Sequence, residues 1–243
     1  MTKRIFDFLV SIIGLLLLAP IILLFMLLVW LQDWHSPFYI APRIGKNGVL
    51  FMMIKLRSMV INADKTGVDS TSNDDKRITI LGGIIRRYKL DEITQLLNVL
   101  MGKMSLVGPR PQVESDVLLY TKEEKKLLNE KPGITDFSSI IFSDEGKILE
   151  GSQDPDLDYN QLIRPWKSRL GLFYIENISF LLDMKLILTT VLSIFSRRKA
   201  ILTVVRILNN FSAPSELIEV AGRKKKLIPH PPPGSTDIIC KIP

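Results

Sequence analysis

Residues 86–111 read RRYKLDEITQLLNVLMGKMSLVGPRP, and this stretch combines a helix start with two carboxylates and three arginines. The carboxylates, Asp91 and Glu92, open a segment whose apolar residues recur at helical spacing. The first turn of a helix presents unpaired N–H groups, which bind phosphate or keep a carboxylate ionised. Arg86 precedes the pair and Arg110 follows it between two prolines, and arginine grips phosphate oxygens through two parallel hydrogen bonds. The stretch therefore predicts a site for a phosphorylated ligand.

The two carboxylates have two interpretations. Beside arginines they stay charged, so one of them can attack phosphorus as a nucleophile, or the pair can bind Mg²⁺. Acidic residues in a first helical turn are also ordinary capping groups, and an Arg-Arg pair is usually a solvated surface. The pair alone favours capping, and only the surrounding pattern can reverse that preference.

Residues 8–31, FLVSIIGLLLLAPIILLFMLLVWL, contain no charge, and about 20 apolar residues are enough to cross a bilayer. The stretch is too long for the apolar part of a signal peptide, so we expect membrane association. Lys3 and Arg4 precede it and favour a cytoplasmic N-terminus. Pro20 removes a backbone donor at mid-segment, so the helix should kink or break there. A kinked span and a re-entrant pair of half-helices both fit these residues.

The rest of the chain predicts a small β-hairpin and several helices. Asn47-Gly48 separates two β-prone runs, as in a hairpin turn. Apolar residues 178–195 fit a second span, a core helix or an interfacial helix, and the basic triplet after them favours the interface. The other expected elements are a polar loop at 62–77, a helix over 78–100 interrupted near Gly82-Gly83 and reopening around Leu90, a helix over 113–129, an acidic loop at 141–158 and a helix over 159–170.

Composition limits the classes of protein that the chain can be. Its 243 residues, 47% hydrophobic and 23% charged, fit one globular domain with a membrane-facing portion. Residues 197–241 hold nine basic and three acidic residues, so +6 of the net charge of +7 lies there, which suits anionic lipid or a phosphorylated ligand. These cations lack interleaved aromatic residues, which argues against nucleic acid. A single cysteine, Cys240, excludes an intrachain disulfide.

Several segments closely resemble, in order and spacing, the bacterial sugar transferase family of small monotopic phosphoglycosyl transferases. They are KRIFDFLVSIIGLLLLAP, RIGKNG, IKLRSM, DDKRIT, RRYKLDEITQLLNVLMGKMSLVGPRP and KPGIT. The resemblance runs from Lys3 to about Thr135 and resumes weakly at residues 183–185. The departures from the family pattern are Ala19 in place of a serine, Lys89 in place of a small residue, Thr94 in place of a proline, and the run DFSSIIFSDEG after Thr135.

The resemblance implies an enzyme that moves a sugar-1-phosphate from a nucleoside diphosphate sugar, usually a UDP-sugar, to polyprenyl phosphate and releases UMP. It implies that Asp91 is the nucleophile of a covalent aspartyl-phosphosugar intermediate and that Glu92 assists in metal binding or proton transfer. The implied cofactor is Mg²⁺, held by both carboxylates. Arg86 and Arg110 would hold the diphosphate or the nucleotide.

The resemblance also implies where the protein works. The family's N-terminal helix is re-entrant and breaks at the position of Pro20, and the active site lies on the cytoplasmic face of the bacterial inner membrane. Such enzymes begin the synthesis of a surface glycoconjugate. The expected partners are a nucleoside diphosphate sugar, polyprenyl phosphate and anionic membrane lipids, without nucleic acid, and a homodimer is left open.

Three further basic residues, Arg43, Lys55 and Arg57, lie in segments that match the family, and we consider them candidates for phosphate contact. Lys55 and Arg57 also alternate with apolar neighbours, as solvated charges on one face of a strand do. Both interpretations fit the sequence.

The expected fold class is α-rich α+β, with a re-entrant N-terminal helix, a small β-hairpin and interfacial helices around a cytoplasmic active site. We expect the membrane helix over residues 1–36, the catalytic domain over 37–196, and a basic, partly flexible extension over 197–243. The alternative function is a non-catalytic membrane scaffold that binds anionic lipid through the basic tail.

Overall fold

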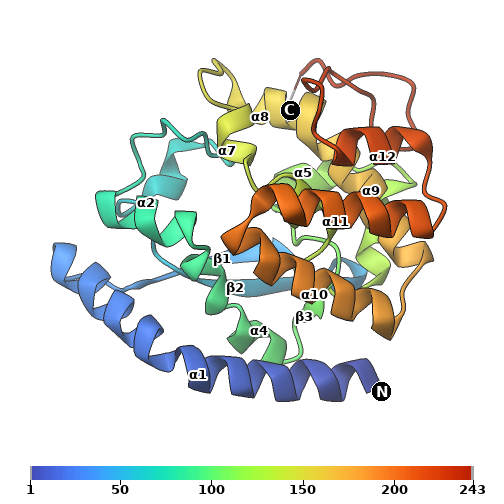
Figure 1. Ribbon diagram of the computed structural model, residues 1–243. Coiled ribbons are helices and arrows are strands. Elements are labelled where there is room, and N and C mark those ends of the chain that lie inside the picture. Colours follow the sequence, from blue (N-terminus) through green and yellow to red (C-terminus); the bar gives the residue numbers. More distant parts are fainter. Residues whose placement is uncertain (1, 242–243) are drawn as a thin grey trace.

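The computed structural model describes residues 2–241 as a mostly helical body with two small sheets, so the α-rich α+β class is confirmed (Figure 1). The helices are α1 (Thr2–Asp33), α2 (Ile80–Arg87), α3 (Leu90–Ile93), α4 (Leu96–Leu100), α5 (Glu114–Leu118), α6 (Phe137–Ile141), α7 (Glu145–Ile148), α8 (Pro155–Asp158), α9 (Arg164–Glu176), α10 (Phe180–Phe195), α11 (Arg197–Asn210) and α12 (Ser215–Ala221). The short 3₁₀ turns are η1 (Lys46–Gly48), η2 (Ala63–Thr66) and η3 (Glu124–Asn129), and η4 (Tyr159–Ile163) is a π-helix. The antiparallel strands are β1 (Phe38–Ile44) and β2 (Leu50–Leu56), and the parallel strands are β3 (Ser105–Val107) and β4 (Gly133–Thr135).

The N-terminal helix α1 is one continuous helix of 32 residues, and it is long and apolar enough to cross a membrane. Pro20 lies inside it, and Figure 1 shows that α1 bends near its middle. Of the expected kink or break, the structure shows a bend within one continuous helix. Proline removes only one N–H donor, and the other backbone hydrogen bonds keep an apolar segment helical.

Both ends of α1 are fastened to the same body. At the N-terminal end, the Lys3 ammonium pairs with Asp183 of α10 and donates to the Val107 carbonyl at 3.1 Å. At the C-terminal end, Arg57 donates two hydrogen bonds of 2.6 Å to the Asp33 carboxylate. Lys3, which the sequence offers as a topology signal, is thus also a structural anchor of the helix.

Apolar side chains are exposed along α1 and α10. Leu16 of α1 is 71% exposed, and Phe195 of α10 is 83% exposed. The rings of Phe6 and Phe180 pack edge to face with centroids 5.2 Å apart, which joins the N-terminal ends of the two helices. Exposed apolar surface of this extent marks a face that contacts another apolar phase or partner.

The predicted hairpin is confirmed. Phe38 lies opposite Leu56 and Ile44 lies opposite Leu50 across the antiparallel pair. In the η1 turn Asn47 has a φ of 58°, in the left-handed region that asparagine and glycine tolerate best. The Asn-Gly signal identifies the turn because few other residues accept this backbone conformation.

The second helix begins at Leu90 as predicted, but the interruption expected near Gly82-Gly83 is wrong. The helix α2 continues through Gly82 and Gly83, and the chain leaves helical geometry at Lys89, whose φ is 55°. Gly82 instead allows α2 to pack closely against the backbone of Ser58, because a Cβ atom at residue 82 would lie 1.8 Å from the carbonyl oxygen of Ser58.

Two other local expectations were wrong. The expected helix over 113–129 is divided into α5 and η3, and the Glu124 carboxylate accepts a hydrogen bond from the Thr121 N–H where the chain turns. The expected loop over 141–158 contains α7 and α8, and α8 begins where the Asp154 side chain accepts from the Leu157 N–H. The helices expected over 159–170 and 178–195 correspond to η4 with α9 and to α10.

The C-terminal helices belong to the main core. Val204 and Leu208 of α11 are completely buried, and they pack in one cluster with α6, α9 and α10. Beyond α12 an extended segment crosses α9, where the His230 ring stacks on Trp166 with centroids 4.4 Å apart. A boundary at residue 196 therefore does not separate two packing units, because α11 covers apolar side chains that the preceding helices leave open.

Gly82 and Gly83 form a matched pair for testing the approach of α2 to Ser58. Gly82→Ala should lower the free energy of unfolding by about 2 kcal/mol or more, because the new methyl group meets backbone atoms. Gly83→Ala meets no atom within 4 Å and should raise it by about 1 kcal/mol. Denaturation in detergent, followed by circular dichroism, measures both. Equal effects of the two substitutions would contradict the close packing.

Candidate active site

The site begins at the free edge of β2. Ile54 donates its N–H to Asn98 Oδ1 at 2.9 Å, and its carbonyl accepts from Thr94 Oγ1 at 3.1 Å. Asn98 also donates through Nδ2 to the Met52 carbonyl at 2.7 Å. Asn98 of α4 and Thr94, which directly follows α3, thus satisfy backbone groups that a strand edge inside the protein would otherwise leave unpaired. This docking places α3 beside Lys55, the next residue of β2.

Asp91 and Lys55 face each other inside a cleft. Asp91 Oδ2 lies 3.8 Å from Lys55 Nζ, and the two side chains are 14% and 20% exposed. Burial raises the pKa of Asp91 above its ordinary value, and the Lys55 ammonium opposes that rise. Burial likewise lowers the pKa of Lys55, and the Asp91 carboxylate opposes it. Each group therefore favours the charged form of the other.

Glu92 is paired with Arg110. Arg110 Nη2 donates to Glu92 Oε1 at 2.8 Å. Burial alone would raise the pKa of Glu92, but the Arg110 guanidinium, together with Lys89 and Lys55, lowers it to about 2. Glu92 is consequently ionised at all ordinary pH values, and Arg110 keeps nitrogen atoms free to bind another anion.

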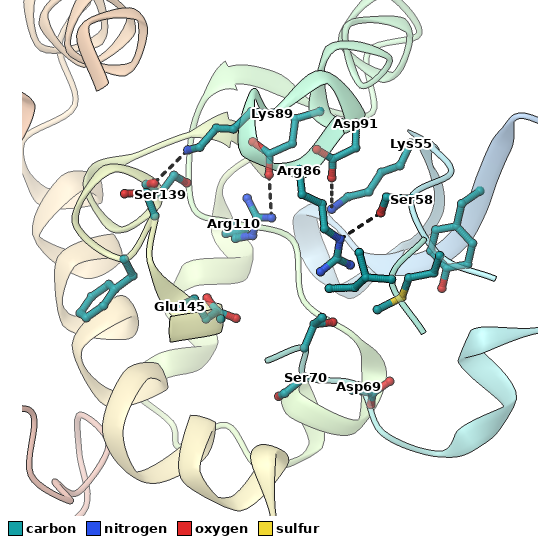
Figure 2. Close-up of a pocket in the computed structure, with 18 of the residues that line it drawn as sticks. Lys55, Ser58, Asp69, Ser70, Arg86, Lys89, Asp91, Arg110, Ser139 and Glu145 are labelled. Carbon is teal, nitrogen blue, oxygen red and sulfur yellow. Dashed lines mark hydrogen bonds and ion pairs between the residues drawn. The ribbon is translucent and has the colours of Figure 1, made fainter. Parts of the chain in front are cut away.

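Two more cations line the cleft near the carboxylates, as Figure 2 shows. Arg86, in the last turn of α2, donates from Nε to Ser58 Oγ at 3.0 Å. Lys89 donates to the Ser139 carbonyl at 3.2 Å and so ties the start of α3 to α6. Lys89 holds a positive φ there, which costs a non-glycine residue conformational energy.

The cleft has a volume of about 890 Å³. Its opposite wall includes Asp69 and Ser70 of the loop over 62–77, Glu145 at the start of α7, and Lys167 of α9. Arg77 shapes that loop by donating to the Val68 and Ser70 carbonyls. The walls therefore come from segments that are far apart in the sequence.

The structure brings Asp91, Glu92, Arg86, Arg110 and Lys55 together as the sequence suggested, but it uses Arg57 differently. β2 ends at Leu56, so Arg57 lies just beyond the strand. Its guanidinium forms an ion pair with Asp33 at the end of α1. Arg43 lines the cleft, although its Nη1 donates to the Pro42 carbonyl rather than to the carboxylates.

Sequence reasoning missed several residues of the cleft. Lys89 was noticed only as a departure from a pattern, and Lys167 and Glu145 lie in segments without a motif. Arg197, counted with the basic tail, lines the cleft and pairs with Asp144 at 2.8 Å. Contacts between segments that are far apart in the sequence bring these residues to the cleft, so no local pattern in the sequence identifies them.

The chemistry available here follows from the charges. An ionised carboxylate with little solvation is a competent nucleophile, and guanidinium groups beside it bind a polyanion and stabilise developing negative charge. Among residues 2–241 no group of three acidic, histidine or cysteine side chains gathers as a complete metal site. Asp91 and Glu92 still suit Mg²⁺, which commonly takes one or two protein carboxylates and completes its shell with phosphate oxygens and water.

Comparisons with known proteins show what the chain is similar to. The family model described as bacterial sugar transferase matches residues 1–197. Exopolysaccharide production protein ExoY of Sinorhizobium fredii is 33% identical over 205 residues, which are 78% of this chain and 84% of that protein. Undecaprenyl-phosphate glucose phosphotransferase of Komagataeibacter xylinus is 36% identical over 80% of this chain and 36% of that protein. UDP-galactose-lipid carrier transferase of Erwinia amylovora is 39% identical over 55% of this chain and 31% of that protein.

The Glu92–Arg110 pair predicts a specific pH dependence of stability. Because the pKa of Glu92 is lowered to about 2 in the folded state, its stabilisation is complete above its ordinary value and is lost as the pH falls toward 2. Glu92→Gln should therefore cost on the order of 2 kcal/mol at pH 7, and the difference from the parent should shrink below about pH 4.5.

Chemical denaturation across this pH range measures the difference. Glu130→Gln is the matched control, because Glu130 meets Lys46 at 3.7 Å with both side chains more than 40% exposed. A pH-independent difference between Glu92→Gln and the parent would contradict the assignment.

Proposed function

The chain belongs to the bacterial sugar transferase family, and we propose that it transfers a sugar-1-phosphate from a UDP-sugar to polyprenyl phosphate. The names of the relatives from Komagataeibacter xylinus and Erwinia amylovora describe an undecaprenyl-phosphate acceptor and a UDP-galactose donor, which supports both substrates. The relative from Sinorhizobium fredii is named for exopolysaccharide production, so we propose that the product starts a bacterial surface glycoconjugate. The observation that carries the proposal is Asp91, a buried carboxylate 3.8 Å from Lys55 in a cleft lined with cations.

Asp91 is the proposed nucleophile. One of its carboxylate oxygens attacks the phosphorus that bears the sugar, the bond from that phosphorus to the bridging oxygen breaks, and UMP leaves with the electron pair. An oxygen of polyprenyl phosphate then attacks the aspartyl phosphosugar, forms the lipid-linked product and frees the carboxylate. Two displacements at one site avoid bringing two anionic substrates together at the same moment.

The neighbouring cations have separate roles in this proposal. Lys55 keeps Asp91 ionised against the effect of burial, so that a poorly solvated and reactive carboxylate is present. Arg110, anchored by Glu92, and Arg86, anchored by Ser58, bind the diphosphate oxygens and stabilise the charge on the departing UMP. Arg43 lies on the same cleft and can contact the same group.

Mg²⁺ is the proposed cofactor. Asp91 and Glu92 would supply the protein ligands, and the ion would offset the negative charge of the diphosphate. Arg110 holds Glu92 in the ionised form that such binding requires.

We also propose that α1 is re-entrant and that the cleft faces the cytoplasm. A helix that crosses a bilayer leaves its two ends on opposite sides, whereas the Lys3–Asp183 and Arg57–Asp33 pairs hold both ends of α1 on one body. The bend near its middle allows the apolar segment to dip into one leaflet while both ends stay with the polar body. A UDP-sugar is a cytoplasmic substrate, which supports the cytoplasmic face.

Asp91→Asn should lower UMP release about 1,000-fold or more, because an amide oxygen is a poor nucleophile. Purified protein is assayed with Mg²⁺, a panel of UDP-sugars and polyprenyl phosphate. With donor alone, mass spectrometry should find a phosphosugar adduct on the parent's Asp91 peptide. Asp74→Asn, which changes an exposed carboxylate outside the cleft, is the control.

Retained turnover in Asp91→Asn would remove Asp91 as the nucleophile. Liposome binding without metal-dependent turnover of any donor would instead favour the non-catalytic scaffold.

Cysteine labelling tests the orientation of α1. In a Cys240→Ser background, Thr2→Cys and Lys76→Cys place single thiols at the start of α1 and in the loop over 62–77. An impermeant maleimide should label both in inverted vesicles and neither in intact cells. Labelling of the two positions from opposite sides would contradict the re-entrant helix.

A further inference from the structure

Charge is unevenly distributed over the walls of the cleft. Lys55, Arg86 and Arg110 gather beside Asp91, whereas Glu145 and Asp69 lie farther from Asp91 on two separate segments, as Figure 2 shows. Phosphate groups bind on the cationic side and are repelled by ionised carboxylates. The part of the cleft around Glu145 and Asp69, where Lys167 is already paired with Glu145, therefore suits an uncharged part of the substrate better than a phosphate.

Glu145 is held in place by a buried partner. Its Oε2 accepts a hydrogen bond from Lys167 Nζ of α9, and the Lys167 side chain is only 7% exposed. The Lys167 ammonium also lies 4.9 Å from the centroid of the Tyr159 ring, which fixes its position further. The pairing orients the Glu145 carboxylate, while 31% of its side chain stays exposed in the cleft.

The second carboxylate oxygen of Glu145 is available to a ligand. Oε1 accepts no hydrogen bond from residues 2–241, and an ionised carboxylate can accept several. Two hydroxyl groups on adjacent carbon atoms of a sugar can both donate hydrogen bonds to one carboxylate. A carboxylate on the sugar would instead bring two like charges together in a partly buried site.

The position of Glu145 in the chain favours the sugar over the nucleotide. Glu145 lies in the run DFSSIIFSDEG, which departs from the family pattern between Thr135 and the weak match at residues 183–185, whereas the residues around Asp91 lie inside the motifs. The relatives from Komagataeibacter xylinus and Erwinia amylovora are named for glucose and galactose, so the sugar differs between members. A wall outside the common motifs suits the part of the donor that varies.

We propose that Glu145, oriented by Lys167, accepts hydrogen bonds from hydroxyl groups of the donor's sugar, and that the enzyme uses uncharged sugars and rejects uronic acids. This inference rests on the proposed function and names the substrate class of the same site.

The test compares donors and variants in the UMP-release assay. The parent, Glu145→Gln and Glu150→Gln are assayed with UDP-glucose, UDP-galactose, UDP-N-acetylglucosamine and UDP-glucuronate. Glu150 is exposed and outside the cleft, so its variant is the matched control. The kcat/KM of the best uncharged donor should exceed that of UDP-glucuronate about 100-fold in the parent.

Glu145→Gln should lower kcat/KM for the best uncharged donor about tenfold and reduce the preference over UDP-glucuronate by a similar factor, because the charge that repels the uronate is gone. Its Kd for UMP, measured by titration calorimetry, should stay within about twofold of the parent, which also shows that the variant is folded.

Three results would overturn the inference. They are a parent enzyme that prefers UDP-glucuronate, a Glu145→Gln variant with unchanged donor preference, and a loss of UMP affinity in Glu145→Gln that matches the loss of donor affinity. The last result would assign Glu145 to the nucleotide. Failure of the parent to release UMP from any donor would instead count against the proposed function, and the two failures are thereby distinguished.

Discussion

The capping of the β2 edge by Thr94 and Asn98 is the contact on which the site depends. A strand edge inside a protein must pair its N–H and C=O groups, and here two side chains do so at Ile54. Because Ile54 and Lys55 are neighbours, satisfying the backbone of one fixes the direction of the other. The distance of 3.8 Å between Lys55 and Asp91 follows from this docking, so a hydrogen-bonding requirement sets the electrostatics of the cleft.

The two carboxylates at the start of α3 are compensated locally, each by its own cation. Glu92 faces Arg110, and Asp91 faces Lys55, so the cleft keeps several charges partly out of water without leaving one isolated. The pairs are partial, since each arginine retains free donors, and the cations together still attract an anionic ligand. The arrangement leaves donors free for the diphosphate of the proposed substrate.

Ion pairs also attach the apolar helix α1 to the polar body of the protein. Lys3 and Arg57 bind carboxylates at opposite ends of α1, so its apolar surface is held along one side of the molecule, next to that of α10. The C-terminal helices α11 and α12 then complete the core from the other side. The apolar helix and the cleft are thus connected, because Arg57, which binds Asp33 at the end of α1, follows the strand that carries Lys55.

The sequence by itself determined the apolar helix, the Asn-Gly hairpin and the motif around Asp91 and Glu92, because periodicity, turn chemistry and spacing are local properties. It could not decide that α2 continues through Gly82 and Gly83, that α11 packs in the core or that Glu145 lines the cleft, because these depend on segments far along the chain. Only the tertiary structure decided which charge meets which. Lys55 turns to Asp91 and Arg57 to Asp33 of α1, although they stand two residues apart, because the strand ends between them and different neighbours cover each side chain.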